Sequence, residues 1–483
     1  MKHKNILMLA KKFLFFTFIT FFLNCSSSQT PTWYYAWNNT VNNLEAASDS
    51  EIIPALINGS NYRILKINNF AGETFKDFTY QSRNSQIEIF QLPLMQNHSN
   101  GNILDLILPL KKNEKLYDTG RDKYFLLKFK SHTAGEEKIS LSLSSDKKLY
   151  TYNKQVRTGN FTYKSSLNLN VFAYFDYNFL IKDLKTQVIQ DLVNHDNNVL
   201  VIPPAALPNL TQKVYDTSAL RNYLKGTENK FEYYILYFNF NDAKIDFANP
   251  VMRKNMLVWY NSMMRVFEDN NINTKKVLLF PFDEPKKQQI TELMTMYKTA
   301  RGLGIQNPFF VTVDNLEAGK ALLSTIEFVQ MKPETMKLLK GFTPKSQLWS
   351  YQLTYGSRDR KATEYRDMSV TAFKNNATGI GMWNYADVDR AVGNKGQAEF
   401  SRGIGTWNIN YASPSAEYAL IYRKNNTIYS SLRWEALSFG MQDYFWLQLY
   451  KNKYGALSTN KLLEQIDRLS EKERDDFKLK IIN

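Results

Sequence analysis

The sequence predicts an α/β protein in which an all-β sandwich domain precedes a (β/α)8 TIM-like barrel, and a hairpin and a long helix follow. Short alternating apolar runs fill residues 32–165, and eight apolar runs alternate with mostly helical stretches over 166–415. Residues 416–483 read as a hairpin and then a continuous apolar stripe packed on the barrel. A chain of 483 residues with 43% hydrophobic content can bury the cores of such domains.

Residues 1–24 are predicted to be a signal peptide. Four lysines flank the apolar run "FLFFTFITFFLN", which is too short to cross a bilayer comfortably. Cys25, the only cysteine, follows at once, and "FFLNCSSSQ" resembles a bacterial lipoprotein signal, with Asn24 where Gly or Ala is usual. The resemblance implies lipidation of Cys25, a tether over 25–31, and export to a bacterial membrane, the outer membrane or cell surface. An ordinary signal peptide with an incidental cysteine is the alternative.

The net charge of +15 does not indicate a nucleic-acid partner. Residues 1–24 hold four of the lysines and no acid, so the rest of the chain carries +11. The sequence has no basic helix, no aromatic RNA-binding motif and no zinc-finger spacing. A lysine-rich, solvated surface explains the charge, and a single cysteine excludes a disulfide framework.

The predicted sandwich consists of short runs that Gly, Asn, Ser and Asp separate. "KISLSLS" alternates with the two-residue period of a half-buried strand. The other runs are "NYRILKINN", "QIEIFQLPL", "ILDLILPL", "YFLLKFKSH" and "KLYTYNKQV".

The predicted barrel rests on eight runs with helical patterns in most gaps, for example "QQITELMTMYKTARGLG" with its glycine stop signal. "TIEFVQM" is the weakest run. An open doubly wound sheet is the alternative, although no Gly-rich phosphate loop follows the first run. The predicted strands are 171–176, 198–203, 233–240, 276–282, 308–314, 325–331, 347–353 and 379–385.

The C-terminal part is predicted to form a β-hairpin and then a long helix that begins near Ser430. Leu432, Leu437, Met441 and Tyr444 follow one another at helical spacing. We expect this stripe to pack in the core.

Two adjacent acids, Asp283 and Glu284, end the strand-like run "KVLLFPF". Mid-strand neighbours point to opposite faces, so the pair fits a strand end. Pro285 disfavours helical geometry at Glu284, and we expect an extended chain there. In a barrel this end faces the mouth, where one carboxyl group of a close pair can hold a proton beside a charged neighbour. The alternative is that Asp283 caps a loop and Glu284 is solvated.

The run "LLFPFDEP" resembles the Asp-Glu-Pro strand of glycoside hydrolase family 123. "LWSYQLTYG" and "GIGMWNYAD" are similar to two late strands of the related domain of unknown function 4091. Ser438 and Phe439 stand where that family usually has Arg-Asp. The terminal-helix signature of the family is matched by Ser431, Arg433, Glu435, Gly440, Asp443 and Tyr444.

The resemblance implies hydrolysis of β-linked N-acetylhexosaminides, with N-acetylgalactosamine favoured, by a retaining and substrate-assisted mechanism. The 2-acetamido oxygen of the substrate attacks the anomeric carbon, so no carboxylate nucleophile is needed. Glu284 would be the general acid and then the base, and Asp283 would orient the acetamido group.

Four aromatic residues are predicted to line the glycan site: Trp349, Tyr351, Trp383 and Trp407. Their rings can stack on sugar faces, and Tyr351 can hydrogen-bond the acetamido oxygen. Packing in the barrel core is the alternative for each. Arg433 and Glu435 are predicted to form a structural ion pair against the barrel.

We expect no metal and no cofactor, because no HExxH motif and no paired Cys/His spacing occurs. The sequence also has no G-x-S-x-G motif, which argues against an α/β-hydrolase. A different class remains open, namely a non-catalytic carbohydrate-binding surface lipoprotein on the same scaffold. The sequence does not indicate an oligomeric partner.

Overall fold

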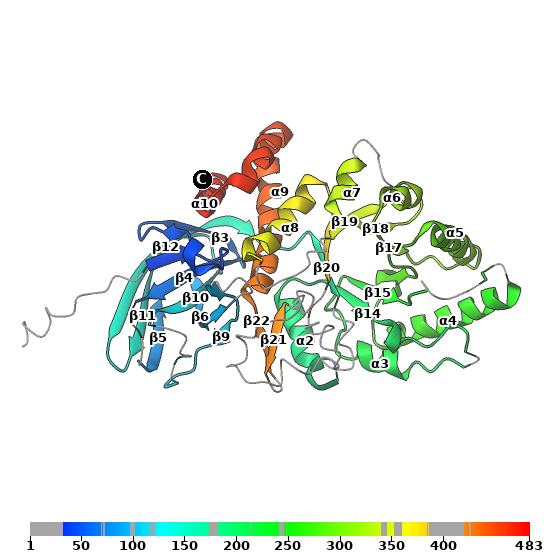
Figure 1. Ribbon diagram of the computed structural model, residues 1–483, viewed down its shortest axis with the longest axis horizontal. Coiled ribbons are helices and arrows are strands. Elements are labelled where there is room, and N and C mark those ends of the chain that lie inside the picture. Colours follow the sequence, from blue (N-terminus) through cyan, green and yellow to red (C-terminus); the bar gives the residue numbers. More distant parts are fainter. Residues whose placement is uncertain are drawn as a thin grey trace, which may run out of the picture.

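The computed structural model places a β-rich domain beside a barrel, with a long helix, α9, between them (Figure 1). No helix within the described part of the chain is long and apolar enough to cross a membrane. The structure describes residues 32–68, 70, 73–96, 102–114, 116, 121–172, 182–212, 214–240, 246–247, 249–339, 345–351, 360–383, 385, 420–424 and 427–483.

The β-rich domain contains two main sheets that a single bridge, Ser131 to Ile57, connects into one ten-stranded sheet. Alternation of apolar and polar residues explains the layers, since Ile139, Leu141 and Leu143 all point into the core between the sheets. One sheet contains β2 (Ala46–Ala47), β1 (Thr32–Tyr35), β4 (Ser60–Ile67), β10 (Lys123–Ser131), β6 (Ser85–Leu92) and β9 (Leu108–Pro109). The other contains β3 (Ile52–Ile57), β12 (Leu149–Thr162), β11 (Gly135–Ser145) and β5 (Phe75–Gln81). β7 (Leu94–Gln96) and β8 (Asn102–Leu104) form a separate two-stranded sheet.

The second domain is a nearly closed barrel of eight parallel strands, and this confirms the predicted fold class. The first barrel strand, β13, pairs with the second, β14, and also with the last, β20. A closed barrel requires this pairing of first and last strands, and an open doubly wound sheet does not. β16 and β17 meet where Leu279 N donates to Pro308 O at 2.8 Å. The strands are β13 (Asn168–Phe172), β14 (Val199–Ile202), β15 (Tyr233–Tyr237), β16 (Val277–Phe280), β17 (Phe310–Val313), β18 (Phe328–Met331), β19 (Gln347–Tyr351) and β20 (Gly379–Trp383).

Seven of the eight predicted runs contain a whole strand, including the weakest, which supplies β18, and the first run overlaps the end of β13. The first predicted strand, 171–176, needs a correction, because β13 begins at Asn168 rather than at residue 171. Asn168 and Asn170 interrupt the apolar pattern, so the first half of this strand does not read as one. Residues 173–176 of that prediction lie outside the described residues.

Helices surround the barrel strands, as the sequence predicts. Asn249 caps α4 by accepting from Val251 N at 2.9 Å, and Gly304 ends α5 with a left-handed φ of 81°. The helices are α2 (Lys182–Asn194), α3 (Ser218–Leu224), α4 (Pro250–Asp269), α5 (Lys287–Gly302), α6 (Leu316–Leu322), α7 (Pro333–Leu338) and α8 (Ala362–Lys374).

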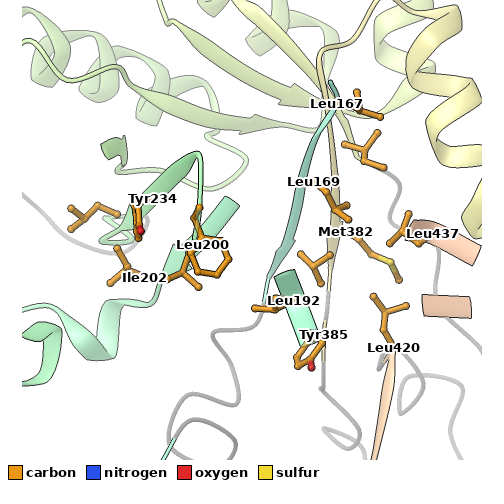
Figure 2. Close-up of a cluster of buried hydrophobic side chains, with 14 of the residues drawn as sticks. Leu167, Leu169, Leu192, Leu200, Ile202, Tyr234, Met382, Tyr385, Leu420 and Leu437 are labelled. Atoms are coloured by element: carbon orange, nitrogen blue, oxygen red, sulfur yellow. The ribbon is translucent and has the colours of Figure 1, made fainter. Parts of the chain in front are cut away.

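The C-terminal part forms the predicted hairpin and helix. Strands β21 (Ile421–Lys424) and β22 (Thr427–Ser430) lead into α9 (Leu432–Gln465), and α10 (Glu471–Ile482) follows. The Ser431 hydroxyl caps α9 by accepting from Trp434 N at 3.1 Å. The predicted stripe is buried in the core. Figure 2 shows one of its members, Leu437 of α9, near Leu169 of β13 and Met382 of β20.

A buried ion pair joins α9 to the β-rich domain. Arg433 donates to both carboxylate oxygens of Asp105, with the shortest contact at 2.9 Å, and neither side chain is exposed. The predicted pairing of Arg433 with Glu435 is therefore wrong, because the two side chains leave the helix toward different partners. An oppositely charged pair held by several hydrogen bonds offsets the cost of burying both charges.

Glu435 binds three groups at the junction of the domains. Its carboxylate accepts from Tyr62 OH at 2.7 Å and lies 3.1 Å from His195 Nε2 and 3.5 Å from Lys128 Nζ. Burial alone would lower the pKa of His195, but the carboxylates of Asp191 and Glu435 raise this pKa to about 10. This histidine is therefore a cation at neutral pH and neutralises Glu435.

Replacement of Gly440 by alanine is expected to destabilise the protein by about 1–3 kcal/mol. A methyl group on this α9 residue would lie 2.4 Å from the backbone oxygen of Arg366 on α8, so the two helices would have to separate. The measurement is the urea midpoint of unfolding. Gly302→Ala is the control, since its methyl group would meet no atom within 4 Å. Equal midpoints for the two variants would contradict the close packing of α8 on α9.

Candidate active site

The acidic pair Asp283 and Glu284 follows β16 at its carboxyl end, as the sequence predicts. Beyond the strand, Phe240 N donates to Pro281 O at 2.7 Å, so the chain stays attached to its neighbour until just before the acids. Phe282 is buried in the apolar layer outside the barrel. Asp283 and Glu284 are both half-buried.

The backbone at Glu284 differs from the prediction. We expected an extended residue before Pro285, but Glu284 has a φ of 47°, in the left-handed region. Proline disfavours the right-handed helical region at the preceding residue and favours extended backbone, so the left-handed conformation of Glu284 departs from the usual effect of a following proline. A non-glycine residue in this region costs about 1–3 kcal/mol, and such residues cluster at functional sites.

Thr312 of β17 contacts both acids. Its hydroxyl donates to Asp283 Oδ1 at 2.5 Å and accepts from the backbone N–H of Glu284 at 2.9 Å. Phe310, two residues earlier, belongs to the apolar core inside the barrel, so Thr312 points inward as well. One side chain thus fixes the Asp283 carboxylate and the strained Glu284 backbone at the mouth of the barrel.

Tyr351 completes the contacts, because its hydroxyl donates to Glu284 Oε1. Tyr351 ends β19 and lies on the inward face, two residues after Trp349. Burial and then the Glu284 carboxylate raise the pKa of Tyr351, so the phenol stays a neutral donor.

A third acid, Asp314, lies just beyond β17 on the same side as Thr312. Burial raises the pKa of Asp283 most, the Thr312 hydrogen bond lowers it, and the charges of Glu284 and Asp314 raise it again. The net effect favours the protonated form of Asp283 more than in water. Lys286 Nζ, largely exposed, lies 3.6 Å from Asp314 Oδ2.

The prediction that Trp349 lines the glycan site needs a correction, since its side chain does not face the mouth of the barrel. Its side chain is 0% exposed and packs on Phe310 and Phe328 in the layer beneath Tyr351. Gly379 leaves room for it, because a methyl group there would lie 2.5 Å from the indole ring. Trp349 therefore supports the site from below and cannot stack on a sugar.

The remaining predicted residues are not tested by the geometry. Trp383 ends β20 beside Phe172, but its side chain lies outside the described residues. Trp407 and Cys25 also lie outside them. Within the described part of the chain, no group of three or more His, Cys, Asp or Glu side chains is arranged to hold a metal ion.

Thr312 and Asp314 were not among the predicted site residues. Both occur in "FFVTVD", where polar residues alternate with apolar ones toward the end of a barrel strand. A strand buried on both faces normally reads as a continuous apolar run, so this alternation was a signal for inward polar groups at the mouth.

Comparison with solved structures confirms the fold. Over 94% of this chain and 96% of the other, the chain is similar to a family 123 glycoside hydrolase from Clostridium perfringens, solved in a study of glycolipid glycan hydrolysis, with a TM-score of 0.64 and 11% identity. A GH2 β-galacturonidase from Eisenbergiella tayi aligns over 80% of this chain and 69% of its own, with a TM-score of 0.34 and 11% identity, which is too loose to bear on the site. No family model and no curated protein matches the sequence.

Proposed function

We propose that the protein is a retaining glycoside hydrolase that cleaves β-linked N-acetylhexosaminides, with N-acetylgalactosamine favoured, by substrate-assisted catalysis. One observation carries the proposal: two adjacent acids at the carboxyl end of a barrel strand contact inward side chains of β17 and β19. The shared fold with a family 123 glycoside hydrolase supports the same conclusion.

Glu284 is the general acid in this proposal. Tyr351 binds Oε1 and orients the carboxyl group, so Oε2 carries the proton to the glycosidic oxygen as the bond from that oxygen to the anomeric carbon breaks. In the second step the carboxylate removes a proton from the water that attacks the anomeric carbon. The same residue thereby serves as acid and then as base.

Asp283 orients the 2-acetamido group of the substrate. The carbonyl oxygen of that group forms a bond to the anomeric carbon as the leaving group departs, and the resulting oxazolinium ion is positively charged at nitrogen. A carboxylate that accepts the N–H stabilises this charge. Burial raises the pKa of Asp283 in the free protein, but it also strengthens the attraction between the carboxylate and the substrate cation. Because the nucleophile belongs to the sugar, the two carboxyl groups can be neighbours in the chain.

The test compares two nitrophenyl glycosides with the wild-type protein. We expect turnover of the N-acetyl-β-galactosaminide and a much lower rate with the β-galactoside, which lacks the acetamido group. Equal rates on both would exclude acetamido participation. Glycan binding without turnover of any hexosaminide would favour the alternative, a non-catalytic carbohydrate-binding protein.

Thr312→Val is expected to lower kcat by roughly 10- to 100-fold, which is the scale of a small misplacement of reacting groups. Valine keeps the shape but removes both the donor to Asp283 and the acceptor for Glu284 N–H. Thr312→Ser keeps the hydroxyl and should retain most of the activity. Steady-state kinetics of the two variants is the measurement, and a fully active valine variant would show that Thr312 positions neither acid.

A further inference from the structure

A pocket of about 570 Å³ lies between the β-rich domain, the barrel and α9, away from the acidic pair. Its barrel residues, Lys164, Ser165 and Asp196, precede β13 and β14, so they lie at the amino ends of the strands. The acids follow β16 at the opposite ends. The pocket is therefore a separate site, in the size range of small-ligand pockets.

The floor of the pocket is the outer face of three adjacent strands. Strand register places Lys128 of β10 between Tyr62 of β4 and Glu88 of β6, and Lys130 between Ser60 and Gln86. These six side chains form two rows that cross the sheet.

The same face of β10 is apolar and buried along one half of the strand and carries lysines along the other half. Tyr124 and Leu126 are buried in the joint core with the barrel and α9, whereas Lys128 and Lys130 border the pocket. A polar outer face of a sheet is normally open to water. Here the barrel and α9 cover it without filling the space above the lysines.

Side chains of α9 and of the barrel supply the walls. Gln442 accepts from Ser60 N at 3.0 Å through its side-chain oxygen, and Ser438, one turn earlier, borders the same space; both are buried. On the barrel side, Asp196 accepts from Tyr163 OH at 2.9 Å. The lining thus offers donors and acceptors together, as sugar hydroxyl groups require.

The cations of the pocket are not equivalent. Lys128 is bound to Glu435 at 3.5 Å, and Tyr62 also contacts that carboxylate. Neither Lys130 nor Lys164 has a carboxylate within ion-pair distance among the residues that the structure describes, and both are exposed. The charge of Lys130 acts on the Asp196 carboxylate, but neither ammonium group is held at ion-pair distance, so both can bind an anionic ligand.

We propose that this pocket binds a sugar unit that carries one anionic group, a carboxylate or a sulfate. Lys130 and Lys164 bind the anion, and the amide and carboxylate groups of the walls bind the hydroxyls. The inference does not rest on the proposed hydrolase activity, because the two sites lie at opposite ends of the barrel.

The test measures binding of methyl β-glucuronide and of galactose 6-sulfate to the full chain by titration, with methyl β-glucoside and galactose as neutral counterparts. We expect saturable binding of both acidic sugars, at least tenfold weaker binding of the neutral ones, and at least a tenfold loss in Lys130→Gln/Lys164→Gln. Lys147→Gln/Lys148→Gln, which removes two exposed lysines outside the pocket, should bind as the wild type does.

Glu284→Gln should also bind the acidic sugars unchanged, which separates this site from the acidic pair. No saturable binding by the wild type would overturn the proposal. Equal losses in both double-lysine variants would overturn it as well. Inorganic sulfate that binds as tightly as the sulfated sugar would mean an adventitious ion only.

Discussion

Glu284→Gln is expected to lower kcat/KM on nitrophenyl N-acetyl-β-galactosaminide by roughly 10²- to 10⁴-fold, the range that a positioned general acid contributes. Glutamine keeps the size of the side chain and can still accept from Tyr351, but it has no proton to give to the leaving oxygen. Steady-state kinetics with purified protein is the measurement. Lys287→Gln, an exposed change three residues away at the start of α5, should leave the rate unchanged.

Substrates with different leaving groups test the role of Glu284 as general acid more sharply. A dinitrophenyl glycoside departs with little need for a proton, so the loss in kcat/KM should be smaller for it than for the nitrophenyl substrate. An equal loss on both substrates would mean that Glu284 acts in binding or folding and not as the acid. Full turnover by Glu284→Gln would remove it from the mechanism.

Arg433→Met is expected to destabilise the protein by about 3–5 kcal/mol, the usual cost of leaving one member of a buried pair alone. Asp105 is fully buried and would keep only the hydroxyl of Tyr422 as a hydrogen-bond donor among the side-chain contacts described. The measurement is the urea midpoint. Arg221→Met is the control, because its partner Asp269 lies at the surface 2.8 Å away, where such pairs contribute about 1 kcal/mol or less.

A second variant distinguishes the lost pair from lost packing. Arg433→Met combined with Asp105→Asn removes both charges and should recover part of the stability. A double variant no more stable than Arg433→Met would contradict the cost assigned to an unpaired Asp105. A midpoint for Arg433→Met equal to that of Arg221→Met would show that the buried pair does not hold α9 on the β-rich domain.

The barrel could be predicted because parallel strands buried on both faces read as short apolar runs. "KVLLFPF" and "TIEFVQM" are such runs, and both contain a strand. The start of β13 was predicted too late in the chain, because Asn168 and Asn170 face polar surroundings that a strand pattern does not reveal. The fold class therefore followed from periodicity, while one boundary depended on tertiary contacts.

The site could be predicted only in part. The acids and Tyr351 end strands whose carboxyl ends meet, so a barrel brings them together. Trp349 was misjudged because an inward position two residues earlier lies one layer deeper, in the core. How deep a side chain lies inside the barrel is set by the register of all eight strands, and a local sequence motif does not reveal this register.

Long-range ion pairs were beyond prediction. Arg433 and Asp105 are 328 positions apart, and no local pattern links a helix residue to a loop of another domain. All six residues of the terminal-helix signature are buried. Arg433 and Glu435 contact the β-rich domain, whereas Gly440 and Asp443 pack on Arg366 of α8. We therefore assign the signature to the packing of α9 against its neighbours rather than to the chemistry of the acids.

Binding of an N-acetylgalactosamine-derived thiazoline, a stable analogue of the oxazoline intermediate, tests the central claim most directly. By calorimetric titration we expect the wild type to bind it roughly 10²-fold or more tightly than N-acetylgalactosamine, as intermediate analogues do, and Asp283→Asn to lose most of that preference. Hydrolysis of hexosaminides by a wild-type protein that binds the thiazoline no more tightly than the free sugar would contradict acetamido participation at the Asp283–Glu284 pair.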